Sequence, residues 1–143
     1  MSVSYEAREH ADYLELACTG SYAPEIPLQV AEEGLKRAAR AGRTALLIDI
    51  CSITGREPTM SERYDMAVQV ANLQSRVTPR IRLALLGREP MIHPQRFGEI
   101  VATNRGALLR SFTDEKLALD WLLGPQASQA RGVVRDSKIA GGI

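Results

Sequence analysis

Four polar side chains near the middle of the chain are the residues best placed for binding chemistry. Asp49 stands inside an apolar run, and Thr54, Thr59 and Ser61 follow it in a polar loop that leads into a helix. In open α/β sheets, ligands bind beyond the carboxyl ends of the strands. Exposed N–H groups at a helix N-terminus favour anions there. We therefore predict that Asp49, Thr54, Thr59 and Ser61 belong to a loop that binds a ligand or a partner.

Each of these residues also has a purely structural interpretation. A buried carboxylate needs hydrogen-bond partners, so Asp49 is expected to accept from N–H groups of the following loop. Thr59 and Glu62 have the spacing of a capping box, in which Thr59 is the N-cap of the helix. Ser61 then lies at N2, where it either supports the cap or accepts a phosphate. Both interpretations of the loop stay open at this point.

The sequence contains no catalytic constellation, and we predict that the protein is not an enzyme. A serine hydrolase needs a serine activated by a histidine and an acid, and the pattern Gly-x-Ser-x-Gly is absent. Neither a Walker loop nor Gly-x-Gly-x-x-Gly occurs. His10, His93, Cys18 and Cys51 are not spaced like metal ligands or a redox pair. We therefore predict neither a metal site nor a cofactor.

Composition places the chain among ordinary single domains. Its 143 residues are 45% hydrophobic and 24% charged, which is enough to bury a core without disulfides or metal. The net charge of +1 argues against binding to nucleic acid, which requires clustered positive charge. The first ten residues are too charged for a signal peptide, and no apolar run approaches the ~20 residues that cross a bilayer. We predict a cytoplasmic protein without membrane insertion.

Hydrophobic periodicity places the loop within alternating strands and helices. An edge strand within residues 2–9 and a strand from Tyr13 to Gly20 come first. A helix through Leu28, Ala31, Leu35 and Ala38 follows and ends at Gly42, and a strand at 45–50 comes next. A helix from Thr59 to about Arg76 leads to a strand at 81–87. The last elements are a helix with Phe97, Ile100 and Val101, a strand at 108–112 and a final helix. Such alternation predicts an α/β fold with a mostly parallel, five-stranded sheet, an antiparallel edge strand and about four helices. We assign residues 1–123 to this domain and residues 124–143 to a C-terminal tail.

The final helix is predicted to begin after Thr113 as its N-cap. In this register, Phe112 and Leu117 would form a hydrophobic staple. Trp121 would continue the buried stripe of the same helix.

The helix that follows Thr59 carries two apolar stripes, although a helix covering one face of a sheet needs only one. The first stripe consists of Met60, Tyr64, Ala67 and Ala71, and the second consists of Met66, Val70, Leu73 and Val77. The second stripe is explained either by a neighbouring helix or the tail that covers it, or by an intermolecular contact. The prediction carried forward is a homodimer interface through Met66, Val70, Leu73 and Val77.

Several segments together carry a family resemblance. They are Leu46-Leu-Ile-Asp-Ile with Thr54-Gly55, Ser61-Glu-Arg-Tyr-Asp, Arg82-Leu-Ala-Leu-Leu-Gly87, Phe97-Gly-Glu-Ile-Val-Ala-Thr-Asn-Arg-Gly106, and Phe112-Thr-Asp with Ala118-Leu-Asp-Trp-Leu122. Over roughly residues 5 to 123 the chain resembles the STAS superfamily of anti-sigma-factor antagonists. Within it, the chain is most similar to the SpoIIAA-like branch that is also grouped with CRAL-TRIO lipid-binding domains.

The resemblance implies a regulatory module that docks to a partner kinase and is released by phosphorylation of a serine at the start of the second helix. That serine lies in an Asp-Ser-Ser-Gly stretch, which is absent here, where the chain reads Ile53-Thr-Gly-Arg-Glu-Pro-Thr-Met-Ser61. We predict a non-catalytic protein-interaction module that associates with itself and with a regulatory partner. The alternative is a binding module for a small apolar or lipid-like ligand, with a pocket supplied by the loop after Asp49 and by residues 90–94.

Overall fold

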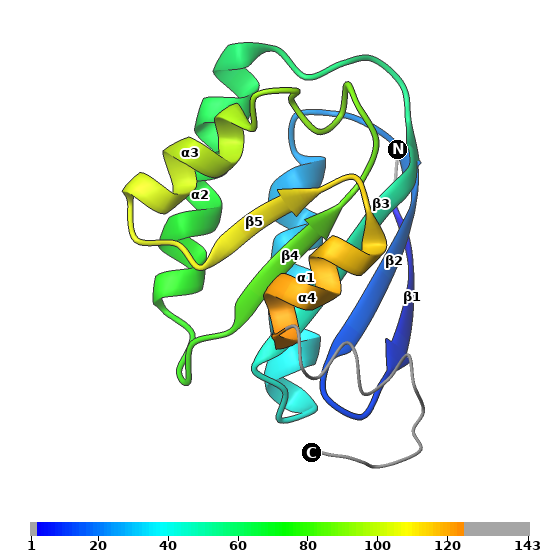
Figure 1. Cartoon of the computed structure of the whole chain (residues 1–143). Helices are drawn as coiled ribbons and strands as arrows, with labels where there is room; N and C mark the ends of the chain where they lie inside the picture. The colour runs from blue at the N-terminus through cyan, green and yellow to red at the C-terminus, as the bar shows by residue number, and fades with distance from the viewer. Residues whose placement is uncertain (1–2, 125–143) are drawn as a thin grey trace.

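The computed structural model describes residues 3–124, which form an α/β fold (Figure 1). The predicted tail lies outside the described residues, apart from Gly124. The described elements are β1 (Ser4–Glu9), β2 (Leu14–Ser21), α1 (Ile26–Arg40), β3 (Ala45–Thr54), α2 (Met60–Ser75), β4 (Arg82–Leu86), α3 (Phe97–Asn104), β5 (Leu109–Phe112) and α4 (Glu115–Leu123).

The strands form one sheet in the order β1-β2-β3-β4-β5. β1 runs antiparallel to β2, and every other neighbouring pair is parallel. The predicted five-stranded, mostly parallel sheet with an antiparallel edge strand and four helices is therefore confirmed. Because β2 to β5 follow one another in space and each crossover is right-handed, α1, α2 and α3 lie on one face of the sheet. α4 follows the last strand and covers the other face (Figure 1).

Side chains of each strand alternate between two hydrophobic cores. In β3, Leu46 and Ile48 enter the larger core beneath α1, α2 and α3, whereas Leu47 enters the smaller core beneath α4. All three are almost completely buried. This explains why the strand is a continuous apolar run, as expected for a parallel strand covered on both faces.

Small residues let α1 pack closely on β3. A Cβ added at Gly34 would come 3.1 Å from the side chains of Ile48 and Leu46.

The helix α1 ends as predicted at Gly42, which follows the C-cap and has a φ of +70°. Glycine adopts this left-handed conformation without the steric cost that other residues incur.

The prediction for the start of α4 is wrong by one residue. The N-cap is Asp114, whose Oδ1 accepts a hydrogen bond of 3.1 Å from Leu117 N, and not Thr113. A shift of one residue turns a helix by about 100°, so Leu117 is 57% exposed and the predicted staple with Phe112 is absent. Ala118 and Leu122 are the buried residues of this helix.

Trp121 also differs from its predicted place in the buried stripe of α4. It is half-buried at the edge of the smaller core. The Arg82 guanidinium lies over its ring at 4.3 Å. Trp121 therefore packs at the boundary between core and solvent, where an aromatic ring and a cation attract one another.

Candidate functional site

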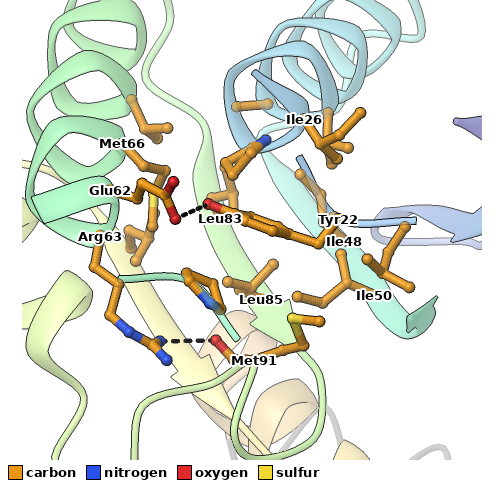
Figure 2. A pocket seen from close by; sticks show the side chains of 17 residues that line it. Tyr22, Ile26, Ile48, Ile50, Glu62, Arg63, Met66, Leu83, Leu85 and Met91 are labelled. Carbon is orange, nitrogen blue, oxygen red and sulfur yellow. Dashed lines mark hydrogen bonds between the residues drawn. The ribbon is translucent and has the colours of Figure 1, made fainter. Parts of the chain in front are cut away.

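A cavity of about 100 Å³ opens between α1, α2 and the face of the sheet that they cover, where its lining extends from Leu83 and Leu109 to Ile53. Apolar side chains from both helices, from β3, β4 and β5 and from the loops that hold Pro58 and Met91 form its walls (Figure 2). The labelled apolar residues are Ile26, Ile48, Ile50, Met66, Leu83, Leu85 and Met91. An engineered apolar cavity of about 150 Å³ binds benzene, so this volume suits one ring or a short branched chain. The two methionines add walls that can adapt to a ligand.

Tyr22 and Glu62 meet across the cavity although 40 residues separate them (Figure 2). The Tyr22 hydroxyl donates a hydrogen bond of 3.2 Å to Glu62 Oε1. Tyr22 is held in place by the loop after β3, because its N–H donates to Thr54 O at 2.7 Å. Gly55 permits this approach: its φ is +107°, and an added Cβ would lie 3.2 Å from Tyr22 N.

Glu62 is the most heavily hydrogen-bonded group at this site. Its carboxylate accepts two bonds from Arg56, at 2.9 and 2.7 Å, and one of 2.9 Å from Thr59 N. The Arg56 hydrogen bonds, followed by that from Thr59 N–H, lower the pKa of Glu62 to about 2. Burial, and next the charge of Glu62, raise the pKa of Tyr22 to about 12. At neutral pH the pair is a stable carboxylate–phenol hydrogen bond.

Arg63 is a buried cation beside the cavity. Its side chain is only 4% exposed, and its guanidinium donates to the carbonyls of Met91 at 2.9 Å and Pro90 at 2.6 Å. These bonds join α2 to the loop at 88–96. Its nearest described carboxylate is that of Glu57, 3.5 Å away and 58% exposed. Arg63 Nε is buried and has no hydrogen-bond partner among the described residues.

None of the four residues of the predicted binding loop lines this cavity. Asp49 Oδ1 accepts from Cys51 N at 2.9 Å, which agrees with its structural interpretation. Thr54 Oγ1 donates to Gly20 O at 3.3 Å. Thr59 forms the predicted capping box with Glu62 and is the N-cap of α2. Ser61 is exposed in the first turn of α2, which agrees with either of its two interpretations.

The second apolar stripe of α2 is covered within the monomer. Val70 is 3% exposed and lines the cavity, and Met66, Leu73 and Val77 are partly buried against the larger core. α2 packs between α1 and α3, so its apolar surface is wider than a helix in contact with the sheet alone requires. This agrees with the alternative that a neighbouring helix covers the stripe. The homodimer stays a prediction, and the burial of Val70 weighs against it.

The loop after Asp49 and residues 90–94, from which the sequence predicted a pocket, supply Ile53, Pro58 and Met91 to the cavity, whereas Tyr22 and Arg63 were not singled out. Tyr22 lies in a segment without periodicity, and Arg63 has the residue type of a solvated helix face. Only the capping-box spacing of Thr59 and Glu62 gave a local signal. The other rim contacts join residues far apart in the sequence.

The fold of this chain is similar to that of solved structures. The crystal structure of an anti-sigma factor antagonist from Mycobacterium paratuberculosis aligns with a TM-score of 0.55 and 12% sequence identity, over 85% of this chain and 94% of that one. The chain has a STAS-like fold. The resemblance predicted from the sequence is thus confirmed at the level of fold. No family model matches the sequence, and no curated protein matches it.

A second structure also aligns with this STAS-like chain. It is an uncharacterized protein with a SpoIIAA-like fold from Shewanella loihica PV-4, with a TM-score of 0.46 and 23% identity over 84% of this chain and 93% of that one.

Metal-binding clusters and reactive thiols would each indicate chemistry among the described residues. Between residues 3 and 124, no cluster of three or more His, Cys, Asp or Glu side chains could hold a metal ion. Burial raises the pKa of the Cys18 thiol to about 12 and also raises the pKa of Cys51. Both thiols are therefore protonated at neutral pH. In the same part of the chain, no helix combines the length and the apolarity needed to cross a membrane.

Replacing Glu62 with glutamine is expected to weaken the acid dependence of stability. The pKa of Glu62 is lowered from 4.5 to about 2 in the folded protein, so its carboxylate stabilises the fold fully above pH 4.5. This contribution is lost as the pH falls toward about 2. Urea unfolding measured between about pH 6 and about pH 2 should show a smaller fall in the free energy of unfolding for Glu62→Gln than for the wild type. Parallel curves for the two proteins would contradict the assignment.

Proposed function

We propose that this chain is a non-catalytic binding module that takes a small apolar ligand in the cavity of Figure 2. The observation that carries the proposal is the cavity itself, whose walls are apolar and whose rim holds a few polar groups. Small-molecule sites have this composition, and in open α/β folds they lie at the carboxyl ends of the strands. The alternative function predicted from the sequence is therefore the one that the geometry supports best.

The polar groups of the rim support binding better than catalysis. A general base works best with a pKa near the operating pH, whereas the pKa of Glu62 is about 2. Its oxygens are already committed to Arg56, Thr59 N–H and Tyr22. The neutral Tyr22 hydroxyl and the Arg63 guanidinium are suited to orienting a ligand.

Filling the cavity from α1 is expected to abolish ligand binding without loss of stability. Ala31 is buried and lines the cavity, so Ala31→Leu places its added carbons where the ligand would lie. The melting temperature should equal or exceed that of the wild type, because the new side chain fills space that is empty. Binding of toluene, measured by saturation-transfer NMR, should weaken by at least about tenfold.

Ala39→Leu is the matched control, since Ala39 lies on the same helix but is exposed. Its toluene binding should equal that of the wild type. If Ala31→Leu binds toluene as well as Ala39→Leu does, the ligand does not occupy this cavity. Native mass spectrometry of protein purified from its own cells would show whether a small molecule is carried there.

The second candidate function is a regulatory module that binds a protein. It is favoured by the fold, which is shared with a structure described as an anti-sigma factor antagonist. It is also favoured by Met60 and Tyr64, two large apolar side chains exposed on the first half of α2. Self-association is the simplest form of this function, and light scattering of the native protein would detect a dimer mass. A cytoplasmic location stays a prediction.

A further inference from the structure

Of the charged side chains around the cavity, Glu62 has a close partner of opposite charge, whereas the buried Arg63 has no buried one among the described residues. Arg56 and Glu62 form a bidentate pair at the rim, and the Glu62 oxygens accept two further hydrogen bonds, from Thr59 N and Tyr22. The negative charge of Glu62 is therefore already compensated. Arg63 is different because its partners are two neutral carbonyls and the Glu57 carboxylate, which lies 3.5 Å away and is 58% exposed.

A buried guanidinium whose one described counter-charge is exposed to solvent is costly, because removal from water is repaid only by a well-placed anion. The Glu57 carboxylate is 58% exposed, so solvent screens its attraction to Arg63. Arg63 Nε also retains an N–H group that is buried and bonded to no described residue. One hydrogen-bond acceptor that carries negative charge would both pair with the buried positive charge and accept from the Nε N–H group.

The cavity lies directly beside this cation. Arg63 is one of its lining residues, and Figure 2 shows the guanidinium at its edge next to Met91. The remaining walls are almost wholly apolar, and the volume of about 100 Å³ admits a ring or a short branched chain. A molecule that fills the cavity therefore carries its charged group at the edge near Arg63 and its apolar body between α1 and α2.

We propose that the ligand is a small monocarboxylate with a compact apolar body, and that Arg63 recognises its carboxylate. This inference rests on the proposed function and names the ligand class for the same cavity. A carboxylate oxygen can accept from the Nε N–H of Arg63, which has no described partner, and hydrogen bonds to charged groups are stronger than neutral ones. A phosphate group is larger and presents more acceptors than Nε, the one guanidinium nitrogen without a described partner, can satisfy.

Three probes of similar size test the proposal with the unmodified full-length protein. Benzoate carries the carboxylate, benzamide replaces it with a neutral group of nearly the same shape, and toluene provides the apolar body alone. In NMR titrations at neutral pH, benzoate should bind at least about tenfold more tightly than benzamide. Equal affinities for benzoate and benzamide would overturn the carboxylate inference. In that case, binding of toluene would still support the proposed function. If none of the three binds, both fail.

Arg63→Lys supplies an independent test, because lysine keeps the positive charge but loses the Nε donor and the planar fork. The ratio of benzoate to benzamide affinity should fall to within about threefold, and toluene affinity should stay unchanged. Arg88→Lys is the control, since Arg88 is exposed and does not line the cavity. An unchanged ratio in a folded Arg63→Lys protein would overturn the inference. If this variant does not fold, the comparison of probes with the wild type decides.

Discussion

Replacement of Gln74 with leucine is expected to lower the free energy of unfolding by about 2–5 kcal/mol. Gln74 is fully buried at the end of α2, where its amide links the beginnings of two strands. Its Nε2 donates to Ile81 O at 2.6 Å and to Leu108 O at 2.9 Å, and its Oε1 accepts from Leu108 N at 2.9 Å. Leucine has a similar size but makes none of these bonds, and water does not reach the backbone groups left behind.

Gln69→Leu is the matched control, because Gln69 is an exposed residue of the same helix. This variant should unfold within about 0.5 kcal/mol of the wild type. Gln74→Glu sharpens the test, since a carboxylate can still accept from Leu108 N but cannot donate to the two carbonyls. Urea unfolding followed by circular dichroism measures all three. A loss below about 1 kcal/mol for Gln74→Leu would show that the amide contributes little.

Gln74 does not line the cavity, although Leu109, the neighbour of the Leu108 that it binds, does. Toluene binding by any folded fraction of the Gln74 variants should therefore match the wild type. This separates a loss of stability from a loss of function.

Val70→Glu is expected to unfold the protein. Val70 is 3% exposed in the larger core, and Arg63, two turns away on the same helix, is the one cation among the residues that line the cavity with it. Burying an unpaired charge exceeds the usual range of mutational effects and costs more than about 4 kcal/mol. A homodimer interface at Val70 would give a different result, namely a folded monomer.

Gln69→Glu is the control for Val70→Glu, since it adds the same charge at the adjacent, exposed position. Circular dichroism and light scattering of both variants distinguish the two explanations. A Val70→Glu protein that keeps its helical signal but halves its mass would restore the predicted interface and contradict the burial. An unfolded Val70→Glu beside a folded Gln69→Glu would assign the stripe to the monomer core.

Local sequence signals determined much of the fold. The continuous apolar run at 45–50 indicated a strand covered on both faces, because parallel strands bury both sets of side chains. Thr59 and Glu62 indicated the start of α2, since a capping box is formed by residues three positions apart. Gly42 marked the end of α1 for a similarly local reason, its left-handed backbone. Each of these features depends on neighbours in the chain, so the sequence alone was sufficient.

Two neighbouring residues can both have the properties of a helix N-cap. Thr113 and Asp114 are both good N-caps, and the sequence did not distinguish them. The structure uses Asp114, which turns Leu117 outward and Ala118 and Leu122 inward. In this register Ala118 and Leu122 lie in the smaller core with Ala84 and Leu86 of β4.

The candidate site was decided by the tertiary structure. Tyr22 and Glu62 are 40 residues apart, and Arg63 binds carbonyls 27 and 28 residues away. No spacing rule connects such residues, because the fold alone brings them together. The energetic importance of Arg63 arises from desolvation, which depends on what surrounds a side chain and not on its position in a helical pattern. The sequence by itself therefore specified the α/β frame, and only packing turned an arginine of α2 into a buried cation beside an apolar cavity.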